Sequence, residues 1–321
     1  MRKSLPYIAV VTSMIIWAGS GIAVKAALEA LAPLTLVLSR FTIGILLMLV
    51  IGLIANRTTA PNSILRLQMV EKQDMWLFVL GGVFEPFLYF IFETYSYKLF
   101  ATPTIAEAFL STNPLIAPIF ALIFLREKVT LWNIIGILVS TGGMLMLVLA
   151  GSASFELGSL WAIPLAFVTV CMAVTYSILL KKVPEKYSSL TMVFWMQLVG
   201  LVLFYLVAGV KVLVHPQAAW LVGKVSGSAV GGVAYLAAMS SVTAFVLFCY
   251  SVRYLGVTKA NIFNNIRPVF TALLMLFIFG EQLPGWKWIG IVVIVLGLFI
   301  CQKQSKKQFK SQTEHLQTQQ L

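Results

Sequence analysis

The chain has 321 residues, of which 60% are hydrophobic and 11% are charged, and its mean hydropathy is +0.94. Soluble domains contain about 45–50% apolar and about 25% charged residues, so the composition excludes soluble enzymes, DNA-binding domains and secreted scaffolds. The net charge is +12. Because an excess of Lys and Arg fixes which loops of a membrane protein stay in the cytoplasm, we attribute this charge to topology and expect no nucleic acid partner.

Apolar runs long enough to cross a bilayer recur along the chain, since a spanning helix needs about 20 such residues. Ten runs lie near residues 5–24, 33–54, 75–97, 103–125, 131–150, 158–180, 189–210, 228–252, 257–279 and 285–302. The first run is too long for the apolar core of a signal peptide, so we expect it to be retained. The sequence predicts an all-α polytopic membrane protein, followed by a disordered cytoplasmic tail over 303–321.

The distribution of basic residues predicts the orientation of the chain. Ten spans place both termini on one side, and with cytoplasmic termini the inner segments hold sixteen Lys and Arg residues and the outer loops hold five. This distribution follows the positive-inside rule. We therefore expect a multi-pass protein of the cell (inner or plasma) membrane with both termini in the cytoplasm, acting as a monomer or a homodimer.

The two halves of the chain, 1–150 and 151–302, resemble each other. Five residues of the first half recur 154 positions later as identical residues: Pro114, Glu127, Trp132, Gly136 and Gly143 match Pro268, Glu281, Trp286, Gly290 and Gly297. Near the start of each half the shift is 156 and pairs Lys25 with Lys181. Because five is an odd number of spans, the second half is predicted to cross the membrane in the opposite orientation. Many secondary transporters are inverted repeats of this kind; the alternative is an old duplication kept only for packing.

The ordered features of the two halves resemble the EamA-type transporters of the drug/metabolite transporter superfamily over residues 5–302. The resemblance is carried by the ten spans, by Pro114 with Arg126, Glu127 and Trp132, and by Pro268 with Gly280, Glu281 and Trp286. It implies an exporter or exchanger of small metabolites such as amino acids, working by alternating access. It also implies a midplane cavity lined by spans 1, 3, 4, 6, 8 and 9, with spans 5 and 10 as a scaffold.

Charged residues inside the spans are candidates for function, because a charge at the bilayer centre costs roughly 2.5–3.5 kcal/mol. They are Arg40, Glu85, Glu93, Glu107 and Arg267. Glu85, Tyr89 and Glu93 share one helical face, which we expect to point into the bundle. The three glutamates are the proton-coupling candidates, with a structural salt bridge as the alternative for Glu85. Arg40 is expected to extend toward the outer interface in a structural role.

The fourth and ninth spans carry the main substrate-binding hypothesis. The repeat makes Asn113 equivalent to Arg267, and Glu107 equivalent to Asn261. Proline residues near these positions interrupt helical hydrogen bonding, and transporters hold ligands at interrupted helices. Arg267 can bind a carboxylate or phosphate through two hydrogen bonds, so we predict that it contacts an anionic group of the substrate. The alternative is a buried ion pair with Glu107 or Glu85.

Aromatic residues complete the predicted site. Trp17 and Tyr176 could stack on the substrate, although packing is the alternative for both. The full predicted binding set is Arg267, Asn113, Glu107, Asn261, Asn265, Trp17, Tyr89 and Tyr176. Outside this set, Glu127 and Glu281 are expected to bond to the next helix. The glycine-containing faces of spans 5 and 10 are expected to pack closely against a helix, with a dimer contact as an open alternative.

The sequence favours a carrier over other classes of membrane protein. The two histidines, His215 and His315, fall outside the spans, and the chain has no HExxH or GxSxG motif. We therefore expect no enzyme activity, no metal site and no cofactor. The partners expected are a small-molecule substrate and the lipid bilayer. A lipid or glycolipid flippase-like carrier is the alternative function, and a wide apolar pathway open to lipid would favour it.

Overall fold

The apolar runs form helices, because inside a bilayer each backbone N–H and C=O group needs a partner within the protein. The computed structural model describes residues 4–60, 63–100, 106, 109–110, 112–127, 129–149, 160–214, 220–280 and 285–302. Over these residues, every element of regular structure is a helix, apart from an isolated bridge between Leu31 and Leu221. The predicted tail over 303–321 lies outside the described residues.

The helices of the first half are α1 (Leu5–Leu28), α2 (Pro33–Thr58), α3 (Met75–Gly82), the π-helical segment η1 (Val83–Leu88), α4 (Tyr89–Leu99), α6 (Asn113–Leu125) and α7 (Leu131–Leu149). Those of the second half are α8 (Ala162–Lys182), α9 (Ser189–Val214), α10 (Gly227–Tyr235), the π-helical segment η2 (Leu236–Ala244), α11 (Phe245–Leu255), α12 (Val257–Asn261), the 3-10 segment η3 (Ile262–Ile266), α13 (Arg267–Phe279) and α14 (Gly285–Gln302).

Seven stretches of the described chain are long and apolar enough to cross a membrane. They are Leu5–Leu28, Pro33–Thr58, Met75–Leu99, Ala162–Lys182, Ser189–Val214, Gly227–Leu255 and Val257–Ile278. Three further apolar helices are shorter, Asn113–Leu125, Leu131–Met146 and Gly285–Cys301. The chain is therefore an all-helical, polytopic membrane protein, and the number of ten spans stays a prediction.

Two of the long stretches are interrupted near their middles, which the apolar pattern did not predict. In η1, Pro86 has no N–H group to donate, and Glu85 has an extended backbone with φ −147° and ψ 117°. In η2 there is no proline, and the hydroxyl of Thr243 donates to the carbonyl of Ala238 at 3.1 Å. Both segments widen the helix next to the cavity described below.

Packing contacts occur in two matching sets. Helix α1 packs against α10, α11 and α13, and α8 packs against α4 and α6. Lys25, in the last turn of α1, donates to the carbonyl of Phe100 at 3.0 Å, at the end of α4. Lys181, in the last turn of α8, donates in the same way to the carbonyl of Arg253 at 2.6 Å, near the end of α11. Lysine at such a helix end satisfies carbonyl groups that have no helical partner.

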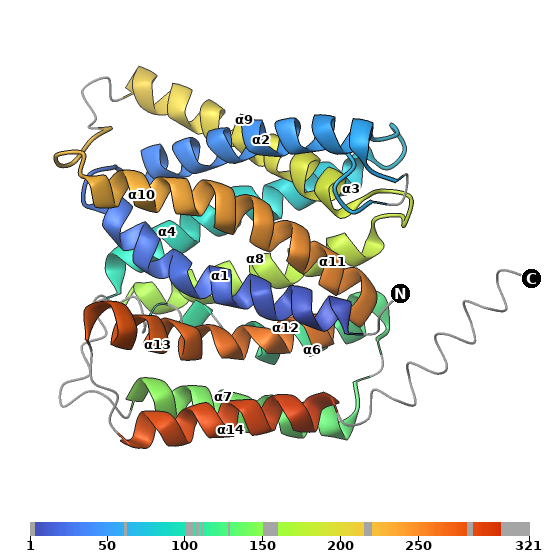
Figure 1. The fold of residues 1–321 in the computed structure, drawn as a ribbon, viewed down its shortest axis with the longest axis vertical. Coiled ribbons are helices and arrows are strands. Elements are labelled where there is room, and N and C mark those ends of the chain that lie inside the picture. Colours follow the sequence, from blue (N-terminus) through green and yellow to red (C-terminus); the bar gives the residue numbers. More distant parts are fainter. Residues whose placement is uncertain are drawn as a thin grey trace, which may run out of the picture.

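Corresponding helices of the two halves run in opposite directions (Figure 1). The segment from α3 to α4 runs from right to left in that view, and the segment from α10 to α11 runs from left to right. Helix α1 begins and α14 ends at the same end of the bundle. These directions are expected if the second half of the chain is inserted in the opposite orientation to the first half.

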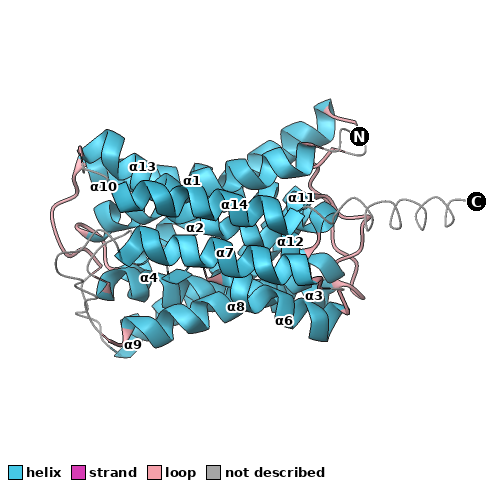
Figure 2. Ribbon diagram, turned by 90° about the horizontal axis from the view of Figure 1, so that it is seen from below, coloured by secondary structure: helices cyan, strands magenta, loops and turns pink. Residues whose placement is uncertain are grey.

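Small residues allow α7 and α14 to pack closely against each other (Figure 2), and the pair forms a layer of its own at the bottom of the view in Figure 1. A Cβ atom added at Gly143 would lie 2.7 Å from the backbone nitrogen of Ile294 and 2.8 Å from the carbonyl oxygen of Gly290. One added at Gly136 would lie 2.6 Å from the carbonyl oxygen of Gly297. The prediction of close packing is confirmed. The glycine-containing faces of α7 and α14 pack against each other within one chain.

An ion-pair cluster joins the loop after α2 to the loop after α8. The ammonium group of Lys186 lies 2.8 Å from the carboxylate of Glu71 and 2.9 Å from that of Asp74. The hydroxyl of Tyr187 also donates to Asp74 at 2.8 Å. Hydrogen bonds from Lys186 lower the pKa of both carboxyl groups and raise the pKa of the lysine.

This cluster predicts a pH-dependent contribution to stability. Because the pKa values of Glu71 and Asp74 are lowered in the folded state, the contribution is present at neutral pH and is lost as the pH falls below about 4. We expect Lys186→Gln to lower the melting temperature at pH 7 and to have little effect at pH 3. The control is Lys72→Gln, an exposed lysine without an ion pair among the described residues. An equal Lys186→Gln effect at both pH values would contradict the prediction.

Candidate functional site

A buried cavity lies between the two halves of the bundle, next to both π-helical segments. Its lining comes from α1, α2, η1, α4, α6, α8, η2, α11, α12, η3 and α13. The charged residues that line it are Arg40, Glu85, Glu93 and Arg267. The cavity volume is about 30 Å³, which is room for about two water molecules. In this conformation the cavity is too small for a solute much larger than water.

Two carboxylates form one wall of the cavity. Glu85 is 6% exposed and Glu93 is 5% exposed, and the hydroxyl of Tyr89 donates to Glu93 at 2.9 Å. All three residues line the cavity, as the shared helical face predicted. Glu85 interacts electrostatically with Glu93, Arg267 and Arg40. Two acids and two arginines thus share a small volume from which bulk water is excluded.

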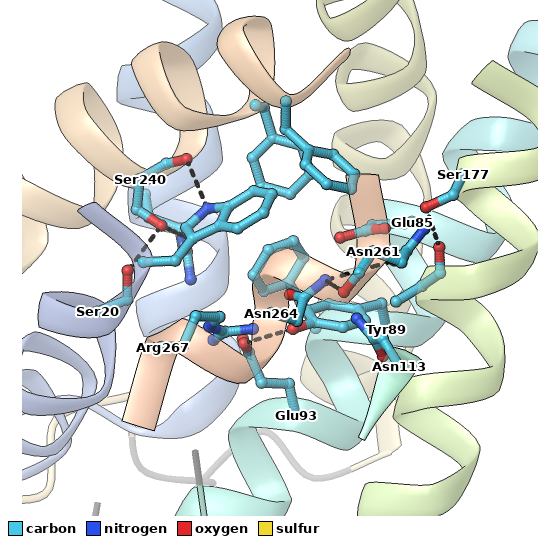
Figure 3. A pocket seen from close by; sticks show the side chains of 16 residues that line it. Ser20, Glu85, Tyr89, Glu93, Asn113, Ser177, Ser240, Asn261, Asn264 and Arg267 are labelled. Atoms are coloured by element: carbon cyan, nitrogen blue, oxygen red, sulfur yellow. Dashed lines mark hydrogen bonds between the residues drawn. The ribbon is translucent and has the colours of Figure 1, made fainter. Parts of the chain in front are cut away.

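Two helices begin at the cavity and point their amino-terminal ends at it. Asn113 is the first residue of α6 and Arg267 is the first residue of α13, and a proline follows each. The start of a helix carries unpaired N–H groups and a partial positive charge. Figure 3 shows Arg267, from α13, and Glu93, from α4, pointing toward the same part of the cavity. The repeat-related residues Asn113 and Arg267 therefore line the same cavity, each at the first position of a helix.

The short segment before α13 adds amide groups to this wall. Asn261 ends α12, and Asn264 lies in the 3-10 segment η3, where its side chain donates to the carbonyl of Asn261 at 2.9 Å. Both residues are buried and line the cavity. Amides of this kind can donate and accept hydrogen bonds without adding charge.

An aromatic wall lies beside the charged one. The guanidinium of Arg267 lies 5.8 Å from the ring centre of Trp17. The Trp17 ring is edge-on or tilted against Phe245 and Phe248, with ring centres 5.1 Å apart in each case. The indole N–H donates to the carbonyl of Ser240 at 3.4 Å, which fixes the ring. The cavity is therefore amphipathic, with charges on one side and aromatic rings on the other.

Arg40 does not extend to the outer interface, so that prediction is wrong. It is 2% exposed, and its Nε and Nη2 atoms donate to Ser241 and Ser240, each at 3.1 Å. Its guanidinium lies 4.4 Å from the ring centre of Phe90. The two serines belong to η2, and the hydrophobic pattern carries no information about which distant helix packs against α2. The sequence feature that could have suggested this contact is the presence of one arginine and two serines inside predicted spans.

Two other predicted residues, Asn265 and Tyr176, lie outside the cavity lining. The side chain of Asn265 donates to Ser140 at 2.6 Å and thus joins η3 to α7. Tyr176 packs edge-on against Phe245, with ring centres 6.1 Å apart, and is not part of the cavity lining. Glu107 lies outside the described residues, as does Glu281. The cavity-lining residues outside the predicted binding and proton-coupling sets are Ser20, Arg40, Phe90, Ala173, Ser177, Ser240, Phe245, Phe248 and Asn264.

Glu127 holds the start of α12, rather than the next helix in the sequence. Its carboxylate accepts from the backbone N–H groups of Val257 and Thr258 at 3.1 and 3.3 Å, and from the Thr258 hydroxyl at 3.0 Å. Gly256 precedes this helix with φ +85°, and an added Cβ atom would lie 3.1 Å from the carboxylate. Glu127 therefore fixes the short helix that carries Asn261 into the cavity.

Replacing Glu127 by glutamine is expected to lower the free energy of unfolding by about 1 kcal/mol, the typical contribution of a helix cap. The change keeps the side-chain length but removes one acceptor oxygen and the charge that favours a helix start. The measurement is thermal unfolding in detergent. Glu185→Gln, at an exposed loop position, is the control for charge alone, and an effect equal to that of Glu127→Gln would contradict the capping role.

Comparisons with known proteins find one family and several relatives. The EamA-like transporter family matches the chain twice, over residues 4–149 and 160–301. An uncharacterized transporter of Archaeoglobus fulgidus is 22% identical over 93% of this chain and 97% of its own length. The uncharacterized transporter YcxC of Bacillus subtilis is 24% identical over 92% of each chain. A WAT1-related protein of Arabidopsis thaliana is 25% identical over 93% of this chain and 84% of its own length.

A solved crystal structure shares the fold. It superposes with a TM-score of 0.69 at 20% identity, over 94% of this chain and 99% of that one. At this identity the likeness concerns the fold alone. A second protein of similar length thus has the same overall arrangement of helices.

Proposed function

Because the chain belongs to the EamA-like transporter family, we propose that it is a secondary transporter of small metabolites such as amino acids, working as an exporter or exchanger. The family and the names of the relatives indicate a membrane transporter rather than an enzyme. The observation that carries the proposal further is the amphipathic cavity between the two halves, with Arg267 and Glu93 on one wall and Trp17 on another.

The proposed architecture is a pair of inverted five-helix repeats, 1–150 and 151–302, with ten spans and cytoplasmic termini in the cell membrane. Two separate matches to the same family support the division. The matching contacts of Lys25 and Lys181, and the opposite directions of corresponding helices, support the inversion. Inverted repeats supply access to both sides of a membrane. When the two halves exchange their conformations, a cavity that was open to one side of the membrane becomes open to the other side.

In the proposed mechanism, each end of a zwitterionic solute meets an opposite charge. Arg267 and the amino-terminal ends of α6 and α13 bind its carboxylate. Glu93, positioned by Tyr89, binds its amino group, and the aromatic wall at Trp17 contacts its apolar part. Pairing two charges inside the cavity offsets the cost of removing them from water.

The small volume of the cavity supports alternating access. A cavity of about 30 Å³ does not hold an amino acid, so the described conformation is closed around the site. The two bundles rock to open the cavity to one side or the other. If protons drive the cycle, Glu85 and Glu93 are the described candidates for the proton carrier, and Glu107 remains a third candidate from the sequence.

The alternative, a lipid or glycolipid flippase-like carrier, calls for a wide apolar pathway open to lipid. The described cavity is small and lined by four charged residues, which favours the metabolite carrier. Both functions are tested with purified protein in proteoliposomes. We expect saturable uptake of one solute from a panel of amino acids and related metabolites, with or without a pH gradient, and no movement of a fluorescent phospholipid between leaflets. Lipid movement without solute uptake would favour the alternative.

A further inference from the structure

The helices around the central cavity form two groups, and each group contains helices from both halves of the chain. Helix α1 packs against α10, α11 and α13, and α2 packs against η2. Helix α8 packs against α4 and α6, and α9 packs against α3 and η1. We call the first set, α1, α2 and α10 to α13, the α1 group, and the second set, α3, α4, α6, α8 and α9, the α8 group. Both groups line the cavity, so a path from the cavity to either end of the bundle runs between them.

Lys25 joins the two groups at one end of the bundle. It lies in the last turn of α1, and its ammonium group donates to the carbonyl of Phe100, the residue that follows α4, at 3.0 Å. A carbonyl group at the end of a helix has no partner within that helix, so the lysine satisfies it. Because α1 belongs to the α1 group and α4 to the α8 group, this hydrogen bond holds the two groups together.

Lys181 joins the two groups through the junction between α11 and α12. It lies in the last turn of α8, and its ammonium group donates to the carbonyl of Arg253 in α11 at 2.6 Å. That carbonyl would pair with the N–H of Val257 if α11 continued. The helix instead ends before Gly256, whose φ is +85°, and the Val257 N–H donates to Glu127 at 3.1 Å. Since Glu127 follows α6, two side chains of the α8 group hold this junction of the α1 group.

The two lysine contacts lie at opposite ends of the bundle, because α4 ends at the left of the view in Figure 1 and α11 ends at the right. We propose that Lys25 and Lys181 are gate residues, each of which holds one end of the cavity closed and releases its carbonyl when the cavity opens to that end. Both contacts are formed around a cavity of about 30 Å³. The inference rests on the alternating access proposed above, and with cytoplasmic termini Lys25 lies at the outer end and Lys181 at the inner end.

Chemical labelling of a cysteine in the cavity tests the two gates without any transported solute. The background carries Cys171→Ala, Cys249→Ala and Cys301→Ala, which remove the native thiols. Ala173→Cys then places one thiol in the cavity lining, near the middle of α8. The probe is a membrane-impermeant trimethylammonium methanethiosulfonate, which reaches the outer side in intact cells and the inner side in inside-out vesicles. The measured quantity is the initial rate of labelling from each side.

We expect Lys25→Met to raise the labelling rate from the outer side about tenfold without raising it from the inner side, and Lys181→Met to have the reverse effect. Losing a hydrogen bond from a charged donor favours the open form by about this factor. Lys25→Arg and Lys181→Arg keep a charged donor and are expected to restore slow labelling. The matched controls are Lys98→Met and Lys182→Met, at exposed lysines in the last turns of α4 and α8, which are expected to change neither rate.

The side from which labelling rises separates a gate from a general structural role. A rate that rises from both sides in either methionine variant would indicate a loosened bundle and would overturn the proposal, as would rates that neither variant changes. A rise from the opposite side in both variants would support a gate at each end and contradict the cytoplasmic termini. The melting temperature of each variant in detergent checks folding. The assay measures no flux, so its outcome is distinct from that of the transport experiment.

Discussion

Replacing Arg267 by glutamine is expected to reduce solute uptake in proteoliposomes more than 100-fold, while the protein remains folded. A guanidinium that donates two charge-assisted hydrogen bonds to a carboxylate contributes about 3 kcal/mol or more, which corresponds to a factor above 100. Glutamine keeps a donor at a similar position but carries no charge. Arg267→Lys keeps the charge without the two-pronged geometry, and we expect it to retain weak uptake with a raised KM.

A double variant separates substrate binding from the alternative, in which Arg267 is a structural counter-ion for a buried carboxylate. If its role were only to neutralise Glu85, then removing that negative charge as well would restore solute binding, measured as the rise in melting temperature that the solute causes. Glu93 is not changed in this test, because it is itself proposed to bind the solute. We expect Arg267→Gln/Glu85→Gln to show no such rise. A rise equal to that of the wild type would contradict the substrate-binding role.

Replacing Gly143 by alanine is expected to destabilise the packing of α7 against α14. The new Cβ atom would lie 2.7 Å from the backbone nitrogen of Ile294 and 2.8 Å from the carbonyl oxygen of Gly290. Since backbone atoms cannot turn aside as a flexible side chain does, α7 and α14 have to separate. Overpacking of this kind costs about 1–3 kcal/mol, and we expect a lower melting temperature in detergent.

The neighbouring residue provides a matched control for Gly143→Ala. A Cβ atom added at Gly142 has no heavy atom within 4 Å in the surroundings, and alanine favours a helix more than glycine does. Gly142→Ala is therefore expected to leave the melting temperature unchanged or to raise it. Similar losses of stability for the two variants would show that helix α7 tolerates neither change and would contradict the close-packing account.

Much of the helical framework could be predicted because hydrophobic length and residue spacing are local properties of the chain. The long apolar runs appear as helices, and the face that carries Glu85 and Glu93 points inward. The glycine faces pack as the spacing of Gly136 and Gly143 indicated. In each case, the physical rule that produces the structure acts within one helix, so it leaves a pattern in the sequence.

The predictions that were wrong or incomplete concern contacts between distant segments. Arg40 was assigned to the interface from its position within its predicted span. Its serine partners lie about 200 positions later in the chain, and the sequence does not show that they contact it. The interruption at η2 contains no proline to mark it. Asn265 shares a span with Arg267, yet its amide reaches α7, because the tighter turn of η3 changes which face each residue presents.

Trans-stimulated uptake tests the central claim most directly, namely that one closed cavity opens alternately to the two sides. Proteoliposomes are loaded with the transported solute in unlabelled form, and the initial rate of labelled uptake is compared with that of empty vesicles. Alternating access predicts a faster, saturable rate in the loaded vesicles, because the loaded site returns across the membrane more readily than the empty one. A rate that is independent of internal solute and rises linearly with external concentration would contradict the account and indicate an open pathway.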